Sequence, residues 1–320
     1  MPFILASGAE AFSEIGSEKA TGTKIISLSG SVERAGVVEV PMGTTLRTII
    51  SEVGGGPPDG RRLSAVAVGG PSSGVFPVSM LGTPIRPGLL HDSGVMLGAG
   101  GVIPPHESFM PGVREICSKH GILLIADEVI TAFGRTGDWS GSRHWGVQPD
   151  MMCTAKAITN GYFPFGAVMI SDAVAEVFEG DTTGKAAIGS GYTYSGHPVG
   201  AAAAIACLKE TERLQVKDNA AARGAQLWEG LKALKEKHTL VGDVRGGHGL
   251  MCAVELVSDR ATKAPIDKKT IGAVHRVAYE NGAMLRVSGP NIILSPPLVL
   301  TEAHVDTILT AMDAGLTAQG

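Results

Sequence analysis

The 320-residue chain is poor in cysteine and has no paired cysteine motif. Its four cysteines are Cys117, Cys153, Cys207 and Cys252, and no two of them form a C-x-x-C arrangement. Zinc knuckles and iron–sulfur clusters depend on such pairs, so the sequence predicts no metal centre of either kind. We expect the thiols to be reduced and mostly buried, as in a cytoplasmic protein.

Positive charge is scarce as well. The chain has 27 lysines and arginines against 31 acidic residues, and its formal net charge is -4. Proteins that bind nucleic acid or anionic lipid carry a basic stripe that neutralises phosphate groups. The sequence lacks such a stripe, so we expect neither nucleic acid nor a membrane as a partner.

Long apolar runs are also missing. The runs at 122–126 and 201–208 are far shorter than the roughly 20 residues that span a bilayer. The opening MPFILASGAEAF lacks the charged start and long apolar core of a signal peptide. We therefore expect a soluble cytoplasmic protein, and its length and 44% hydrophobic content suffice for two domains, each with a core.

The first part of the chain has the pattern of a small α+β domain, predicted over residues 1–97. Residues 24–54 contain two alternating strands joined by a glycine-bearing turn, followed by a helix. The hydroxyl residues Thr44 and Thr45 are N-cap candidates, and the glycines from Gly54 onward end the helix. A third short strand is expected at 65–68.

From about residue 98 the pattern changes to alternating helices and strands. The elements expected there are a helix at 108–120, strands at 121–128, 150–157 and 166–172, a helical tract at 196–238, strands within 244–257, a helix at 268–281, short strands within 284–294 and a last helix from 302. This order predicts an α/β domain at 98–213 with fully buried strands, followed by an α+β lobe at 214–320.

Two polar residues end strands of the expected α/β domain. Asp127 closes the apolar run ILLIAD, and Lys156 follows MMCTA, which places both where open α/β sheets bind ligands. Alone, Asp127 could cap a turn and Lys156 could be a solvated lysine. Together they suit pyridoxal phosphate, which needs a lysine for its aldehyde and an acid for its ring nitrogen. A P-loop NTPase is excluded, because Gly184-Lys185 lacks the rest of G-x-x-x-x-G-K-[ST].

Four motifs of the second part carry a family resemblance. In order they are LLIADEVITAFGRTG, AKAITNGYFPFGAVM, GYTYSGHPVGAAAA and LSPPLVLTEAHVD. This part, about 98–320, resembles the C-terminal part of class III (ω-amino acid or amine:pyruvate) aminotransferases, which are pyridoxal phosphate enzymes of fold type I. The resemblance implies that Lys156 holds the cofactor, that Asp127 pairs with the pyridinium nitrogen, and that Val129 packs against the ring.

The same resemblance implies a homodimer with shared active sites. Thr193 matches the residue that reaches the cofactor phosphate of the neighbouring subunit. Arg286 matches an arginine that binds a substrate carboxylate, although a plain surface arginine fits this position equally well. The expected substrates are an amine or ω-amino acid and a 2-oxo acid such as pyruvate.

The first part resembles a different family. The segments PFILASGAEAF, IGSEKATGTKIISLSGSVERAGVVEVPMGTTL and DGRRLSAVAVGGPSSG are similar to the ubiquitin-like SLBB domain of the complex I and NAD-dependent formate dehydrogenase flavoprotein subunit, and to the chain just before it. This resemblance covers about 1–103, so residues 98–103 satisfy both families. The flavin loop and cluster cysteines of that subunit have no match here, so its electron transfer is not expected.

Three hypotheses for function follow. The first is a transaminase impaired because residues 1–97 do not match the phosphate-binding helix N-terminus and the ring-stacking aromatic of the family's N-terminal half. The second is a catalytically inactive fusion or scaffold protein. The third, supported by the first part alone, is an NADH dehydrogenase flavoprotein-type module.

Overall fold

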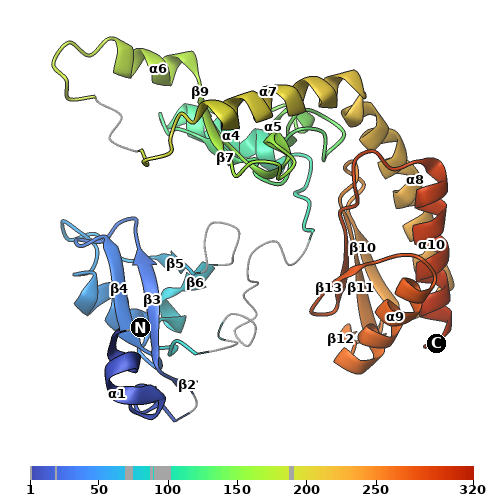
Figure 1. Cartoon of the computed structure of the whole chain (residues 1–320), viewed down its shortest axis with the longest axis horizontal. Coiled ribbons are helices and arrows are strands. Elements are labelled where there is room, and N and C mark those ends of the chain that lie inside the picture. The colour runs from blue at the N-terminus through green and yellow to red at the C-terminus, as the bar shows by residue number, and fades with distance from the viewer. Residues whose placement is uncertain (1, 19, 69–74, 87–88, 90–101, 187–190) are drawn as a thin grey trace. The chain divides into compact units, whose positions relative to one another are not determined.

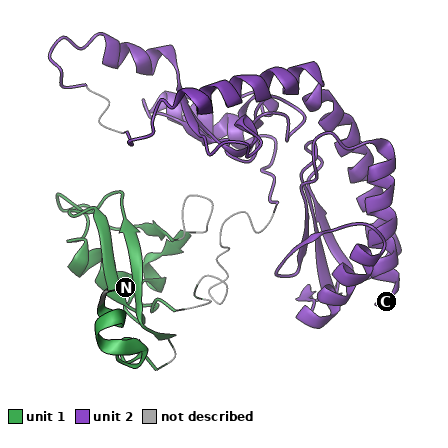
Figure 2. Ribbon diagram, viewed as in Figure 1, with its two compact units in different colours: residues 1–100 green, residues 101–320 purple. Residues whose placement is uncertain are grey.

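The computed structural model describes residues 2–18, 20–68, 75–86, 89, 102–186 and 191–320. The chain divides into two compact units, residues 1–100 and 101–320 (Figure 2). The boundary expected at 97/98 lies outside the described residues, as do residues 98–101 of the segment that satisfies both families. Each unit is therefore described by itself.

The first unit is a small α+β domain. Its elements are α1 (Pro2–Ser13), β1 (Gly16–Ser17), β2 (Ala20–Thr21), β3 (Thr23–Leu28), β4 (Gly36–Pro41), α2 (Leu46–Thr48), the helical turn η1 (Ile49–Val53), β5 (Ala65–Ala67), β6 (Val75–Pro77) and the helical turn η2 (Val78–Met80). Strands β3 and β4 form the expected antiparallel hairpin, and β5 pairs with β6. The strand–strand–helix–strand prediction is confirmed.

Local sequence signals explain this order of elements. The Thr45 hydroxyl caps α2 by accepting a hydrogen bond from the Thr48 backbone N–H at 3.1 Å. After η1, Gly55 and Gly56 take positive φ angles of 76° and 78°, which glycine adopts without steric cost. The core of the unit contains the buried side chains of Val40, Leu46, Ile49, Ile50, Phe76, Leu81, Ile85 and Leu89.

The second unit begins with an α/β segment, residues 102–213, and continues into the C-terminal lobe, residues 214–320. The segment contains α4 (Phe109–Lys119), β7 (Ile125–Asp127), α5 (Gly141–His144), β8 (Met151–Thr154), the turn η3 (Lys156–Ile158), β9 (Ala167–Ile170), α6 (Asp172–Glu179) and α7 (Pro198–Arg213). The lobe contains α8 (Val216–Lys237), β10 (Val241–Arg245), β11 (Cys252–Asp259), β12 (Ala264–Pro265), α9 (Lys268–Glu280), β13 (Arg286–Ser288), β14 (Asn291–Leu294) and α10 (Glu302–Thr317).

The C-terminal lobe is a tightly packed α+β layer structure. Its antiparallel sheet has the order β10-β11-β14-β13, with β12 added to β11. Helices α8, α9 and α10 lie together against this sheet (Figure 1). Leu227, Leu231, Val274, Ile292 and Met312 are fully buried between the layers. The lobe therefore has a continuous core, as the length and hydrophobic content of the chain led us to expect.

The α/β segment corrects one prediction. Its sheet is β7-β8-β9, with β7 parallel and β9 antiparallel to β8. These strands were expected to be fully buried, but the side chains of Ile125 and Val168 are 56% and 62% exposed. A strand is buried on both faces only when neighbouring strands and helices cover it. Within the described residues the sheet has three strands, so some of its apolar side chains are left exposed.

Arg135 and Gly249 join the α/β segment to the lobe. The Arg135 guanidinium donates hydrogen bonds to the carbonyls of Leu250 at 2.8 Å and Pro296 at 2.6 Å. Burial lowers its pKa to about 10. Gly249, at φ +58°, approaches so closely that a Cβ there would lie 2.4 Å from the Arg135 carbonyl. Only a glycine permits this contact.

No helix in the described ranges is long and apolar enough to span a bilayer.

Candidate active site

The candidate site lies at the carboxyl ends of β7 and β8. In the parallel pair, Ile125 stands opposite Met151 and Asp127 stands opposite Cys153. Lys156 lies two residues beyond Thr154, the last residue of β8, at the start of η3. The structure therefore brings the predicted acid and the predicted amine to the same edge of one sheet, where α/β folds bind their ligands.

Asp127 is the last residue of β7, and its side chain is exposed. Its Oδ1 accepts a hydrogen bond from the Val129 backbone N–H at 3.1 Å. This contact is the turn-capping interaction that the sequence alone also allowed. It uses one carboxylate oxygen and leaves the rest of the group open to solvent, so capping and ligand binding are compatible at Asp127. Val129 itself is partly buried beside it.

Lys156 has an unusual backbone conformation. Its φ angle is +48°, in the left-handed region that residues other than glycine seldom adopt. Such strained positions gather at functional sites. The side chain is exposed, and its amine makes no hydrogen bond or ion pair with the described part of the chain. The loop after it is ordered by a 2.7 Å hydrogen bond from the Thr159 hydroxyl to the Phe163 carbonyl.

Thr193 and Arg286 are not brought to this edge by any described contact. Thr193 is exposed in a turn in which the Tyr192 N–H donates to the Ser195 Oγ at 2.9 Å. Arg286 is exposed on β13 of the C-terminal lobe, opposite Ile293 of β14. Within the described part of the chain, neither side chain makes a hydrogen bond or an ion pair with Asp127 or Lys156. Their roles toward a neighbouring subunit and a substrate stay predictions.

The opposite end of the strands is fixed by an ion pair. Asp150 Oδ2 accepts hydrogen bonds from Arg114 of α4 and from the Leu124 backbone N–H, both at 2.7 Å. The Arg114 hydrogen bond is the main cause of a lowered Asp150 pKa, and the Leu124 bond adds to it. The pair ties α4 to the beginnings of β7 and β8. It thereby aligns the two strands whose other ends carry Asp127 and Lys156.

A buried acid next to Asp127 escaped the sequence analysis. Glu128 is only 3% exposed, and its carboxylate accepts hydrogen bonds from Thr131, Gly141 and Ser142. The sequence carries a signal for it, because two acids, Asp127 and Glu128, follow one apolar run. A carboxylate is buried only when donors surround it. Thr131 is three residues away, but Gly141 and Ser142 are 13 and 14 residues further along the chain.

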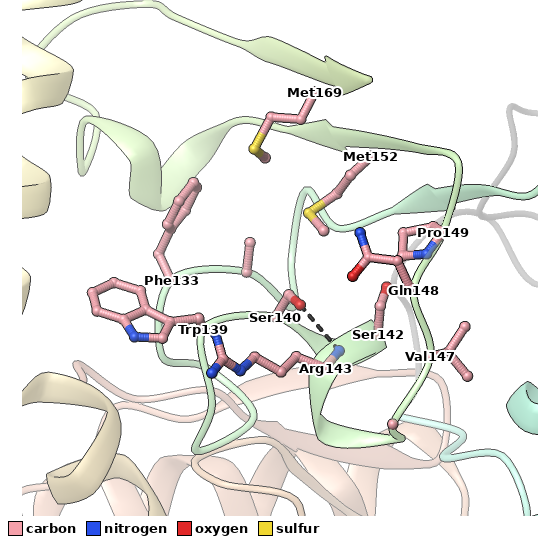
Figure 3. A pocket seen from close by; sticks show the side chains of 12 residues that line it. Phe133, Trp139, Ser140, Ser142, Arg143, Val147, Gln148, Pro149, Met152 and Met169 are labelled. Atoms are coloured by element: carbon pink, nitrogen blue, oxygen red, sulfur yellow. Dashed lines mark hydrogen bonds between the residues drawn. The ribbon is translucent and has the colours of Figure 1, made fainter. Parts of the chain in front are cut away.

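A hollow of about 450 Å³ lies in the same segment but not at the site (Figure 3). Met152 and Met169 are cross-strand partners on β8 and β9, and both side chains point into the hollow with Phe133 and Trp139. Alternation along β8 turns Met152 and Cys153 to opposite faces. Because Asp127 pairs with Cys153, the hollow opens on the other face of the sheet, and neither Asp127 nor Lys156 lines it.

The residues present fit pyridoxal phosphate. That cofactor requires an amine for its aldehyde and a carboxylate for its ring nitrogen. Lys156 offers an amine without a partner in the described residues, and Asp127 offers a solvent-open carboxylate on the adjacent strand. In the described ranges, no group of three or more His, Cys, Asp or Glu side chains could hold a metal ion.

The fold and this pair of strand ends place the chain among the pyridoxal phosphate enzymes of fold type I. The family model described as Aminotransferase class-III matches residues 95–316, and the chain belongs to that family. An SLBB domain model matches residues 25–76. Both resemblances seen in the sequence are thus confirmed, and the family implies pyridoxal phosphate as the cofactor.

Individual relatives agree with this assignment. The chain is 41% identical over 218 residues to a putrescine–pyruvate aminotransferase of Pseudomonas aeruginosa, covering 67% of this chain and 46% of that protein. It is 36% identical over 230 residues to a taurine–pyruvate aminotransferase of Bilophila wadsworthia, covering 69% of this chain and 50% of that protein. The chain therefore spans about half the length of these relatives.

Solved structures show the same partial coverage. An amine transaminase from an uncultivated Pseudomonas species matches with a TM-score of 0.66 and 46% identity, over 70% of this chain and 51% of that chain. An (S)-enantioselective omega-transaminase from Thermomicrobium roseum matches with a TM-score of 0.63 and 39% identity, over 69% of this chain and 49% of that chain.

Proposed function

We propose that residues 98–320 carry the lysine-bearing part of a transaminase site that moves an amino group from an amine or ω-amino acid to a 2-oxo acid such as pyruvate. The observation that carries this proposal is that Asp127 ends one strand and Lys156 lies just beyond the end of its parallel neighbour. The relatives named above use putrescine and taurine with pyruvate, which supports an amine donor and a 2-oxo acid acceptor.

Each residue has one task in this proposal. Bound pyridoxal phosphate supplies an aldehyde that condenses with amines and a ring that accepts electrons. The Lys156 amine holds the aldehyde and, once the incoming amine has freed it, moves a proton away from the substrate carbon that bears nitrogen. The Asp127 carboxylate keeps the ring nitrogen protonated, and Val129 packs against the ring. Arg286 binds a substrate carboxylate.

The assembly belongs to the proposal as well. Thr193 reaches the cofactor phosphate of a neighbouring subunit, so the active form is a homodimer with shared sites. The domain limits proposed for it are 1–97, 98–213 and 214–320. A cytoplasmic location is supported by the four cysteines, all of which are free thiols. Turnover is expected to be impaired, because residues 25–76 match an SLBB domain and not the phosphate-binding half of the family.

A second function, a catalytically inactive scaffold, is favoured by a different observation. The apolar side chains of Ile125 and Val168 are more than half exposed on the sheet that carries the site. Exposed apolar surface of this kind marks contacts with other protein. A flavoprotein-type module, the third hypothesis, draws support only from the SLBB match.

Absorption spectroscopy of the purified protein separates these functions. With pyridoxal phosphate added, we expect a visible band that borohydride removes, that is absent in Lys156→Ala, and that changes its pH dependence in Asp127→Asn. Lys185→Ala, which removes another lysine of the same segment, serves as the control. No band in a protein with normal circular dichroism would favour the scaffold. A bound yellow flavin would favour the third hypothesis.

A further inference from the structure

The two acids that close β7 have opposite surroundings. Asp127 is exposed, while Glu128 is buried and 3% exposed. The Glu128 backbone is held on both sides: its N–H donates to the Cys153 carbonyl of β8 at 2.9 Å, and its carbonyl accepts from the Ala132 N–H at 3.0 Å. The strand end that presents Asp127 is therefore tied down by the residue that follows it.

Both oxygens of the Glu128 carboxylate are fully used. Oε1 accepts from the Ser142 backbone N–H at 2.6 Å and from the Ser142 hydroxyl. Oε2 accepts from the Gly141 backbone N–H at 2.8 Å and from the Thr131 hydroxyl. An ionised carboxylate is an acceptor only, so four donors match it without leaving a buried polar atom unpaired. A Cβ at Gly141 would lie 3.1 Å from Oε2, so the fit is close on that side.

We propose that Glu128 is a positioning residue that sets the direction of the Asp127 carboxylate by clamping the strand end of β7 to the first residues of α5. This inference rests on the proposed function, in which Asp127 meets the cofactor's ring nitrogen. Glu128 lies between Asp127 and Val129, whose N–H binds Asp127 Oδ1, and its own backbone is hydrogen-bonded to Cys153 and Ala132. A displacement of Glu128 is therefore passed on to both neighbours.

The geometry makes glutamine a sharp probe. One oxygen of Glu128 receives the Gly141 N–H and the other receives the Ser142 N–H. In Glu128→Gln one of these oxygens becomes an NH₂ donor. Whichever way the amide is turned, it faces a backbone N–H, and a buried donor loses its acceptor. The side chain keeps its size, so the change tests the hydrogen bonds and not the packing.

The experiment uses the full chain in four forms: unaltered, Glu128→Gln, Asp127→Asn and the control Glu115→Gln. Glu115 is exposed on α4, so this control removes the same charge outside the clamp. Three quantities are measured: amide hydrogen exchange without cofactor, the Kd of pyridoxal phosphate, and the pH at which the absorption band of the bound cofactor changes.

We expect exchange at residues 141–142 and 128–129 to be at least about tenfold faster in Glu128→Gln, and the Kd of pyridoxal phosphate to rise by about the same factor. The pH of the spectral change should move in the same direction as in Asp127→Asn. Exchange in the C-terminal lobe and all results for Glu115→Gln should equal those of the unaltered protein.

Two results would overturn the inference. The first is faster exchange at 141–142 with unchanged exchange at Val129 and an unchanged spectral pH profile, since Glu128 would then anchor only the loop. If the unaltered protein binds no pyridoxal phosphate, the proposed function fails, and the clamp is then judged from hydrogen exchange alone. The second contradicting result is exchange at 128–129 that is equally fast in Glu128→Gln and in the unaltered protein. If Glu128→Gln does not fold, Ser142→Ala, which removes one of the four donors, replaces it with smaller shifts in the same directions; unaltered values in it would equally contradict the clamp.

Discussion

The α/β segment and the C-terminal lobe are similar in apolar composition along their strands but differ in how much of it they bury. In the lobe, β11 and β14 carry side chains such as Val254 and Ile292 that are at most 1% exposed. In the segment, Ile125 of β7 and Val168 of β9 are more than half exposed. An apolar strand can therefore be buried, but whether it is buried depends on strands and helices that come from distant parts of the chain.

The α/β segment and the lobe also differ in how often a side chain caps the N-terminus of a helix. In the lobe, α9 is capped by the Asp267 carboxylate and α10 by a capping box of Thr301 and His304. The lobe helix α8 has no side-chain cap. In the segment, the N-caps of α4, α6 and α7 make no side-chain hydrogen bond, whereas Ser140 caps α5. Side-chain caps are therefore fewer in the region that carries the candidate site, but they are present and absent in both regions. Four measurements test this contrast.

Core truncation should separate the two regions most strongly. Leu231→Ala removes a fully buried side chain of α8, so we expect a loss of about 2–5 kcal/mol in the free energy of unfolding from urea titration. Val168→Ala, on the exposed face of β9, should change it by no more than about 0.5 kcal/mol. A comparable loss in both variants would mean that the β9 face is covered in solution, and the contrast would fail.

Cutting the connection between the regions should have the next largest effect. Arg135→Met keeps most of the side-chain volume but leaves the Leu250 and Pro296 carbonyls without their donor. We expect a loss of about 1–3 kcal/mol and faster hydrogen exchange at the Leu250 N–H, which donates to the Arg135 carbonyl. Arg143→Met, on an exposed arginine, is the control. Unchanged exchange at Leu250 would show that glycine packing alone holds the connection.

Helix caps give a smaller and paired test. Thr301→Ala removes the hydroxyl that accepts from the His304 N–H and should cost about 0.5–2 kcal/mol of unfolding free energy. Ser171 occupies the same position before α6, but its hydroxyl caps nothing and has no partner in the described contacts. Ser171→Ala should therefore leave the thermal midpoint unchanged or slightly higher. A drop equal to that of Thr301→Ala would contradict the difference between the helix ends.

A histidine pair across the two regions should add a pH dependence of small size. His248 Nδ1 lies 2.8 Å from His144 Nε2, and both rings contact Trp145. Burial is the main cause of a lowered His248 pKa; the charge of His144 lowers it further and Glu107 opposes both. The unfolded chain then takes up this proton at a higher pH than the folded chain does.

Because the folded chain binds this proton less readily, lowering the pH destabilises it through His248. The contribution of His248 to stability is complete above its unfolded pKa of about 6.5 and is lost as the pH falls through that value toward the lower folded pKa. In His248→Asn the urea midpoint should therefore decline less between pH 7.5 and 5.5 than in the unaltered protein. His120→Asn, at an exposed histidine, is the control. Parallel pH curves for all three proteins would remove His248 as the cause.

Much of the local structure could be read in advance. The Thr45 cap, the glycines after η1, helix α9 and the two strand ends with Asp127 and Lys156 were predicted from periodicity and from cap and turn residues, and they lie where expected. These features depend on residues within about a turn or a strand of each other. Lys156 was singled out because it follows an apolar strand, as Asp127 ends one, and because its motif AKAITNGYFPFGAVM resembles that of the family.

Features that depend on distant residues could not be predicted from the sequence. The donors on Glu128 come from Gly141 and Ser142, and the carbonyls on Arg135 come from more than 100 residues away. A sequence pattern shows that a residue is charged or apolar, but not which distant atoms approach it. The expectation of fully buried strands failed on this point, because the apolar sequence of β9 does not say what covers Val168.

The amino-acid sequence by itself determined the family and the order of helices and strands, and it offered Asp127 and Lys156 as candidate site residues, because each of these signals lies in a short stretch of adjacent residues. Only the tertiary structure decided that Asp127 stands beside β8 and its lysine, that Glu128 is buried under four donors, and that the apolar strands of the site region remain partly exposed. Burial and hydrogen bonding are properties of atoms brought together from distant parts of the chain, and folding alone brings them together.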